Sequence, residues 1–386
     1  MKLNVIGSTK PGYVLPVEEA LKFSGLEAGI CYMPDSFEAL QHEPEKRTLA
    51  RVKGTVGSGH HSVSGHAVYN FEIEGVPKIL AMLLNNEKEY TTSEKSGRYT
   101  VMATEGKEKE TYDKWVGIFT DLIAETYPSI DEKTRRKLAL ENARYFISVF
   151  TPATTMGYSI GLRQANYIIG FCEEMSMRVT SDPFMKKLKP WLAEFAALVR
   201  GYCNVDGLRD NKGRKFSLFT ERTRKEYFGD TYSVNYLGTF AQLAQAQRHR
   251  SLWYEMQIPD LDDCAFYVPP IIGDNHMDLR GEYLHDMHSL KENYPQGMLV
   301  HINERGTSEA FMMKCCERLC GAAQLEICTQ TAATLKRYIS NAVLNDYPDV
   351  FLELSKYQHK TKCQLGFQSC NRPCPLGPAH VFDRLI

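Results

Sequence analysis

A polar stretch punctuated by glycines divides this chain of 386 residues near its middle, at residues 204–214. The segments after this stretch repeat the order of predicted strands and helices found before it. The length also exceeds that of one ordinary domain. The sequence therefore predicts two similar lobes, although any two α/β domains can share such an order by chance.

Hydrophobic periodicity gives the expected elements of both halves. Residues 66–75 alternate apolar and polar side chains, which predicts a half-buried strand, and residues 1–7 are expected to form a first strand. Helices are predicted over residues 76–84, 106–127, 129–150, 157–177 and 183–203. In the second half we expect a strand near 232–234, a helical run at 240–247, a strand end at 266–270 and one long helix over 308–339.

The composition excludes several classes of protein. A net charge of -1 gives no overall attraction to nucleic acid, so any recognition of charge must be local. No stretch approaches the roughly 20 apolar residues that span a bilayer, and the amino terminus lacks the apolar core of a signal peptide. We therefore expect a cytoplasmic protein that binds neither nucleic acid nor a membrane.

The eleven cysteines do not form the pattern of a disulfide framework, because their number is odd and they are scattered over a large chain. In the tail, Cys363, Cys370 and Cys374 have a spacing that matches no standard zinc or iron–sulfur site. We expect no metal site there, and an irregular tail is favoured. A metal-dependent enzyme built on these cysteines is the alternative if the resemblance described below is spurious.

Two short basic segments carry the chemistry, and they lie far apart in the sequence. Arg248-His249-Arg250 ends a helical run, and its guanidinium groups are forked, permanently charged donors suited to a phosphate or pyrophosphate. Ser96-Gly97-Arg98 offers a hydroxyl, a flexible backbone N–H and another guanidinium. Taken singly, Arg-His-Arg is more often a solvated helix face than a ligand site, and Ser-x-Arg is too short to indicate a function.

Together with their flanks, these segments resemble the flavin-dependent thymidylate synthase family. The resemblance rests on residues 59–66, on the strand that follows and on residues 93–99. The family places an Arg-His-Arg triplet just before a loop that ends Ser-x-Arg-Tyr. Here the first half keeps the loop without the triplet, and the second half keeps the triplet without the loop. These complementary losses predict a duplicated chain whose two copies share one site.

The resemblance implies an α/β (α+β) fold with two similar lobes, each a small antiparallel or mixed sheet packed with long helices. The expected domains are a first synthase-like copy at 1–204, a more degenerate copy at 205–345 and a Cys/Pro/Gly-containing tail at 346–386. Sites of the family lie between subunits of a homotetramer. A homodimer of fused copies, a pseudo-tetramer, is therefore expected here.

The resemblance also implies a reaction: methylation of dUMP to dTMP at C5, with FAD as cofactor and NADPH and methylenetetrahydrofolate as co-substrates. Arg318 and His60 are the expected catalytic residues, Arg318 against the uracil carbonyl and His60 over the flavin where folate binds. Substrate-binding residues are expected to be Gln245, Arg248, Glu94, Ser96, Gly97, Arg98 and Arg318. FAD-binding residues are expected to be Arg248, His249, Arg250, Ser62 and Arg163.

Two alternatives stay open at this point. Expected flavin contacts are missing near Gly161 and Tyr167, so a related flavoenzyme could make a different C5-modified pyrimidine nucleotide. Loss of half of each motif would also produce a homologue that binds a pyrimidine nucleotide without catalysis. Neither alternative needs a cysteine nucleophile.

Overall fold

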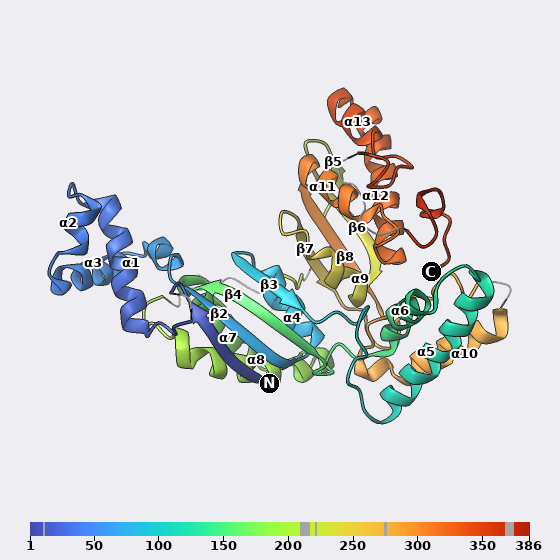
Figure 1. The fold of residues 1–386 in the computed structure, drawn as a ribbon, viewed down its shortest axis with the longest axis horizontal. Helices are drawn as coiled ribbons and strands as arrows, with labels where there is room; N and C mark the ends of the chain where they lie inside the picture. Colours follow the sequence, from blue (N-terminus) through green and yellow to red (C-terminus); the bar gives the residue numbers. More distant parts are fainter. Residues whose placement is uncertain (11, 209–216, 221, 274–275, 367–373) are drawn as a thin grey trace. The chain divides into compact units, whose positions relative to one another are not determined.

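A computed structural model gives the fold of most of the chain (Figure 1). The described residues are 1–10, 12–208, 217–220, 222–273, 276–366 and 374–386.

The first sheet has four antiparallel strands in the order β1-β2-β4-β3. Its strands are β1 (Lys2–Ser8), β2 (Val68–Val76), β3 (Tyr90–Glu94) and β4 (Thr154–Gly161). The alternation in β2 buries Tyr69, Phe71 and Ile73 almost completely. Both strands predicted for this region, at the amino terminus and at residues 66–75, are therefore confirmed.

The second sheet has the same strand order, β5-β6-β8-β7, and is also antiparallel. Its strands are β5 (Tyr227–Phe228), β6 (Thr231–Thr239), β7 (Trp253–Gln257) and β8 (Leu299–Thr307). The two central strands of each sheet are matched at their ends. Val68, the first residue of β2, pairs with Gly161, the last of β4, and Thr231, the first of β6, pairs with Thr307, the last of β8. The predicted fold class, two sheets packed with helices, is confirmed.

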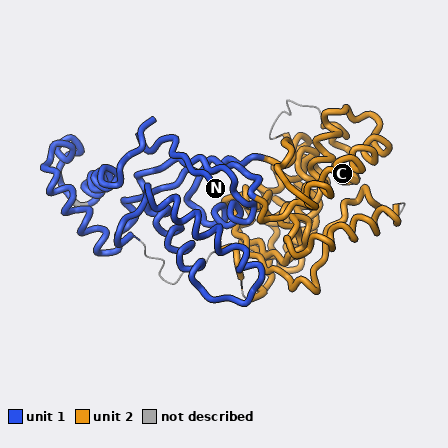
Figure 2. Tube along the Cα trace, turned by 90° about the horizontal axis from the view of Figure 1, so that it is seen from below, with its two compact units in different colours: residues 1–95, 152–216 blue, residues 96–151, 217–386 orange. Residues whose placement is uncertain are grey.

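The chain forms two compact units (Figure 2). Unit 1 contains Met1–Lys95 and Pro152–Phe216, and unit 2 contains Ser96–Thr151 and Ser217–Ile386. The first sheet lies in unit 1 and the second in unit 2. The segment between β3 and β4 thus leaves its own sheet and packs with the second half of the chain. These units group residues by packing, so the predicted copies, bounded at residue 204, stay a prediction.

In the sequence, the helices of unit 1 lie between and after the strands of the first sheet. They are α1 (Val17–Tyr32), α2 (Phe37–Gln41), α3 (Glu45–Gly57), the 3-10 helix η1 (His61–Gly65), α4 (Lys78–Asn86), α7 (Leu162–Met177) and α8 (Pro183–Cys203).

The helices of unit 2 come from both halves of the sequence. They are α5 (Gly106–Thr126), α6 (Glu132–Ala143), η2 (Arg144–Phe146), α9 (Phe240–Ala246), α10 (Met277–Ser289), η4 (Lys291–Asn293), α11 (Ser308–Arg318), α12 (Leu325–Leu344), α13 (Pro348–Ser355) and η5 (Pro378–His380).

An aromatic cluster joins the two parts of unit 2. Trp115 of α5 packs edge-on against Tyr283 of α10 at 4.9 Å and stacks on Phe146 at 5.4 Å between ring centroids. The indole N–H of Trp115 donates to Asp286 over 2.8 Å. Large aromatic side chains contribute much of the stabilisation of a core, so this cluster anchors residues 96–151 in unit 2.

Three helix predictions are wrong in their extent. Residues 154–161 form β4 and α7 begins at Leu162, because alternate side chains of this segment are buried against β2 and β3. The helix predicted for 308–339 is two helices, α11 and α12, separated by a turn at Gly321. The helix predicted for 129–150 ends at Ala143 and continues as the short η2. The strand end predicted at 266–270 is only an isolated bridge from Phe266 to Met298.

Within the described ranges, no helix combines the length and the apolar character needed to cross a bilayer. The same part of the chain holds no group of three or more His, Cys, Asp or Glu side chains placed to bind a metal ion. Cys370 lies outside the described residues.

Candidate functional site

The basic triplet lies in a turn that continues α9 in unit 2. The His249 N–H donates to the Ala246 carbonyl over 2.9 Å, and the Arg248 N–H donates to the Gln245 carbonyl over 3.3 Å. At the other end of α9, the carboxylate of Glu326 accepts hydrogen bonds from both the N–H and the hydroxyl of Thr239, each over 2.8 Å. Both ends of this short helix are therefore fixed, and the triplet is held at a defined position.

Arg318, the last residue of α11, contacts the triplet directly. Its Nε donates to Nε2 of His249 over 2.7 Å. Burial, together with the positive charges of Arg318 and Lys314, lowers the pKa of His249 to about 2. His249 is therefore a neutral acceptor here, and the positive charge of the pair resides on Arg318.

A fully buried ion pair supports Arg318 from one helical turn away. Lys314 Nζ lies 2.6 Å from Glu304 of β8 and 2.9 Å from Oε1 of Gln330. The hydroxyl of Tyr232 donates to the same Glu304 carboxylate over 2.7 Å. Lys314 and Arg318 are four residues apart and share one face of α11, so this pairing also fixes the direction in which Arg318 points.

The Ser-x-Arg loop belongs to the same unit as the triplet. Its turn is closed by hydrogen bonds from the N–H groups of Tyr99 and Thr100 to the Ser96 carbonyl, over 3.1 and 3.2 Å. Arg98 pairs through Nε with Glu141 of α6 and donates through Nη2 to the Ala322 carbonyl over 2.7 Å. The loop is thereby attached to the turn that directly follows Arg318.

Arg98 of the loop and Arg248 of the triplet both act electrostatically on the guanidinium of Arg318. Burial lowers the pKa of Arg318, Tyr254 and Glu317 oppose this effect, and the charges of Arg98 and Arg248 lower the pKa further. Three arginines, from the loop, from the triplet and from α11, therefore gather in unit 2. Such a cluster raises the electrostatic free energy of the protein alone and favours an anionic ligand.

Gln245 adds an unsatisfied acceptor beside this cluster. Its Oε1 atom is buried and has no hydrogen-bond partner among the described residues. A buried acceptor without a donor costs about 1–3 kcal/mol, and a ligand that carries an N–H group would remove this cost. Uracil and thymine carry such a group at N3.

The predicted residues of unit 1 gather where η1 packs on α7. His60 directly precedes η1, Ser62 is exposed within it, and Arg163 lies in the first turn of α7. The guanidinium of Arg163 lies 5.3 Å from the ring of Tyr167, and its buried Nε has no hydrogen-bond partner in the part of the chain that the structure describes. These residues are described within unit 1 alone.

Glu94, at the end of β3, also belongs to unit 1. Its carboxylate accepts from Lys78 Nζ over 2.6 Å and from the amide of Asn85. These two partners orient the carboxylate and neutralise much of its charge.

Several residues that hold the site in place carried no role in the sequence prediction. Arg144 donates to Oε1 of Gln324, and the hydroxyl of Tyr145 donates to Glu326 over 2.9 Å. Only the spacing of Lys314 and Arg318 by four residues signalled such a role, because it places both on one helix face. Arg144 and Tyr145 pair with residues 180 and 181 positions further along the sequence.

Comparison with known proteins identifies the class to which the chain is related. Residues 19–169 match the family model described as "Thymidylate synthase complementing protein". The flavin-dependent thymidylate synthase of Pyrococcus furiosus is 26% identical over 200 residues, which cover 44% of this chain and 77% of that protein. The enzyme of the same name from Pyrococcus abyssi is 25% identical over 159 residues, covering 38% and 62%. The predicted resemblance to the flavin-dependent thymidylate synthase family is thus confirmed, with the family-model match confined to residues 19–169.

Solved structures give a weaker likeness. The UMP/dUMP methylase PolB of Streptomyces cacaoi, bound with 5-Br dUMP, is 12% identical with a TM-score of 0.35, covering 52% of this chain and 90% of that one. Thymidylate Synthase X of Helicobacter pylori, with FAD and dUMP, is 16% identical with a TM-score of 0.29, covering 54% and 99%.

Proposed function

We propose that the protein methylates C5 of a uridine nucleotide, with dUMP as the substrate. The observation that carries this proposal is the cluster of Arg98, Arg248 and Arg318 in unit 2, with the unsatisfied Gln245 beside it. The cluster provides charge for a phosphate, and Gln245 provides an acceptor for a base. The relationship to flavin-dependent thymidylate synthases supplies the reaction class.

The roles follow from the positions of these side chains. Arg318 is oriented by His249 and supported by Lys314, so it can meet the uracil carbonyl with little reorganisation. As the ring is attacked, negative charge develops on that carbonyl oxygen, and a fixed guanidinium would stabilise it. Arg248 completes the contacts to the nucleotide.

The phosphate and sugar of the nucleotide are assigned to the loop. Ser96 offers a hydroxyl, Gly97 a backbone N–H and Arg98 a charged guanidinium. Burial alone would lower the pKa of Arg98, but the interaction with Glu141 is stronger than this effect and raises the pKa. Arg98 therefore stays protonated. We assign Glu94 to the same nucleotide, on the resemblance alone.

FAD is the cofactor of this proposal. We assign Arg248, His249, Arg250, Ser62 and Arg163 to FAD, on the resemblance. Among the described residues, the buried Nε of Arg163 has no acceptor, which fits a role in donating to a ligand oxygen. When bound, the flavin supplies the redox chemistry of the methylation, and NADPH and methylenetetrahydrofolate serve as co-substrates. His60 is placed over the flavin, where folate would bind.

We also infer that the chain is a tandem duplication in which each copy kept one part of the motif. The identical strand orders of the two sheets support this inference. So does the packing of the Ser96–Thr151 segment in unit 2, which brings the loop of one copy to the triplet of the other. A dimer of such chains would have the four lobes of a homotetramer.

The first test is an absorption spectrum of the purified protein, before and after addition of dUMP. We expect a flavin spectrum that is lost in the Arg248→Ala/Arg250→Ala variant and kept in Lys186→Ala/Lys187→Ala, which changes two exposed lysines of α8. Reduced protein with dUMP and methylenetetrahydrofolate should then form dTMP.

Two outcomes would contradict the proposal. Bound flavin without dTMP would indicate a different C5 product. A colourless protein that binds dUMP would indicate a pyrimidine-nucleotide-binding homologue without catalysis.

A further inference from the structure

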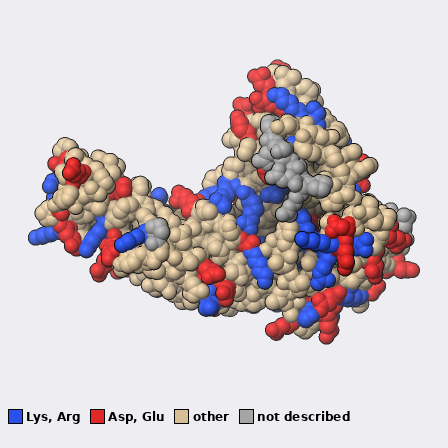
Figure 3. Space-filling view, in the orientation of Figure 1, with Lys and Arg blue, Asp and Glu red and all other residues tan. Residues whose placement is uncertain are grey.

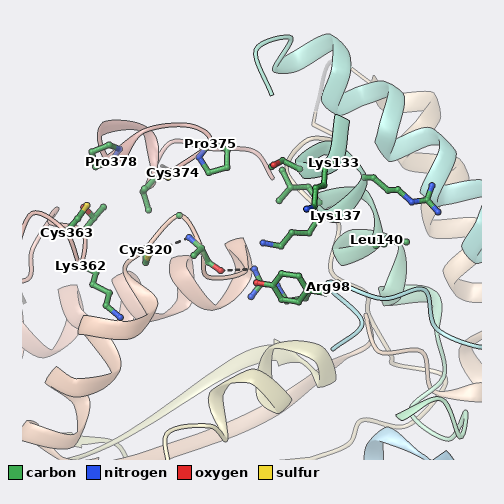
Figure 4. A pocket seen from close by; sticks show the side chains of 18 of the residues that line it. Arg98, Lys133, Lys137, Leu140, Cys320, Lys362, Cys363, Cys374, Pro375 and Pro378 are labelled. Atoms are coloured by element: carbon green, nitrogen blue, oxygen red, sulfur yellow. Dashed lines mark hydrogen bonds between the residues drawn. The ribbon is translucent and has the colours of Figure 1, made fainter. Parts of the chain in front are cut away.

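A cavity of about 940 Å³ lies in unit 2 and shares Arg98 with the arginine cluster. One wall is α6, and the opposite wall is the carboxyl-terminal tail around Cys363, Cys374 and Pro378 (Figure 4). The floor is formed by Arg98 and by the turn that follows α11. Neither Gln245, Arg248 nor Arg318 lines this cavity.

The lining is strongly basic. Among the described residues that line it, the charged members are all cations: Arg98, Lys133, Arg136, Lys137 and Lys362. Figure 3 shows Lys and Arg atoms gathered over α6.

Protein carboxylates neutralise only part of this charge. Arg98 is paired with Glu141, and Lys362 with Glu317 over 2.9 Å. Within the described ranges, Lys133 and Lys137 form no ion pair, and Figure 4 shows both side chains directed into the cavity from α6. They are four residues apart on one helix face, where like charges repel each other. An anion between them would turn this repulsion into attraction.

The same cavity also exposes an aromatic and apolar surface. Tyr99 and Val101 have 60% and 51% of their surface exposed, although both are large apolar side chains. Leu138, Leu140 and Val381 also line the cavity, although Leu140 and Val381 are themselves largely buried. Lys137 lies 4.5 Å above the Tyr99 ring, so charge and ring are presented together.

We propose that this cavity binds an organic polyanion that carries an aromatic ring. The ring would pack on Tyr99 and Val101, and the anionic groups would meet Lys133, Lys137 and Lys362 from opposite walls. The volume lies at the upper end of the range of small-molecule pockets, larger than a mononucleotide requires. A solvated helix face explains exposed lysines, but it does not explain a facing wall with a further cation and exposed apolar side chains between the two.

Two kinds of molecule share this chemistry, a nucleoside triphosphate and an aromatic polycarboxylate. The cavity shares Arg98 with the site proposed for the nucleotide phosphate, but it uses none of the residues assigned to the uracil base or the flavin.

Fluorescence titration with mant-ATP tests the proposal on the full-length protein. We expect the Lys133→Glu/Lys137→Glu variant to bind the probe at least about tenfold more weakly than the unmodified protein at moderate salt. Lys186→Glu/Lys187→Glu makes the same change in net charge on α8 of unit 1 and should bind normally. Lys362→Met, on the opposite wall, should weaken binding as well.

Competition by ATP or by benzene-1,3,5-tricarboxylate then identifies the source, since the tighter competitor marks the natural class. Equal binding by the charge-reversed and unmodified proteins, or no binding of either probe class, would overturn the proposal. Displacement of mant-ATP by dUMP would also overturn it, because the cavity would then belong to the substrate site. Failure to bind dUMP, with probe binding intact, would instead contradict only the proposed methylation.

Discussion

Arg318 donates a hydrogen bond from Nε to Nε2 of His249 over 2.7 Å, and this contact defines the protonation of both residues. The acceptor nitrogen carries no proton, in agreement with a pKa of about 2 for His249. An imidazole that stays neutral at all physiological pH values keeps Arg318 in place without adding a second charge. Four predictions follow from this contact and its surroundings.

The stability of the protein should depend on His249 in acid. Its pKa falls from an ordinary 6.5 to about 2 on folding, so between these values the unfolded state binds one more proton than the folded state. Stability therefore decreases as pH falls below 6.5, by up to about 2 kcal/mol at pH 5. Urea unfolding at pH 7.5 and pH 5 should show this loss, and His249→Gln should show a smaller one. An equal loss in the variant would contradict the assignment.

Removal of one partner of the buried Lys314–Glu304 pair should strongly destabilise unit 2. Lys314→Met leaves the Glu304 carboxylate buried without its cation, and we expect a loss of about 3–5 kcal/mol. The double variant Lys314→Met/Glu304→Gln removes both charges and should recover part of this loss. Chemical denaturation measures each value, with Lys186→Met on the surface of α8 as control. A double variant less stable than Lys314→Met would show that the charge on Glu304 is not the cause.

Gln245→Met should separate binding from stability. The variant removes a buried acceptor that has no partner among the described residues, so thermal unfolding should show unchanged or higher stability. If Gln245 contacts the pyrimidine, calorimetry with dUMP should show affinity reduced by about tenfold, the value of one hydrogen bond to a ligand. Unchanged affinity would remove Gln245 from the nucleotide site.

Gly321→Ala should loosen the tail from the turn after α11. A Cβ added at Gly321 would overlap Sγ of Cys374 in the tail. Arg384 also attaches the tail to this turn, by donating to the Gly321 and Ala323 carbonyls, both over 2.7 Å. We expect lower stability and faster proteolysis of the tail. Gly281→Ala on α10 is the matched control, because its Cβ would enter open space and helix propensity favours alanine by up to about 1 kcal/mol. Equal proteolysis of the two variants would contradict the close contact.

The sequence was sufficient for those parts of the fold that local pattern determines. Alternation at Tyr69, Phe71 and Ile73 predicted β2, and the uninterrupted amphipathic pattern of residues 106–127 predicted α5. It failed at residues 154–161, where glycines and small polar residues mask a strand that only its neighbours reveal. Packing across the sequence decides such segments, and single-sequence patterns do not contain it.

The candidate site shows the same division. The residue types of Ser96-Gly97-Arg98 and Arg248-His249-Arg250 indicated anion binding, and the structure brings both segments into unit 2. The partners that orient them, Glu141 for Arg98 and Lys314 for the helix face of Arg318, were not predicted as such. These contacts depend on the position of α6 and on the pairing of β8, which are tertiary features.

The passage of residues 96–151 into unit 2 has a consequence for synthesis on the ribosome. The apolar side of α5, with Trp115 and Phe119, emerges well before Tyr283 and the rest of α10 have been made. During that interval the first sheet can close, because all four of its strands precede residue 162. Until α10 is made, the segment of residues 96–151 remains a loop between β3 and β4, and its aromatic side chains lack their final partners. A nascent chain stalled between residues 204 and 277 would therefore combine a folded sheet with an exposed apolar helix, which is the kind of surface that chaperones recognise.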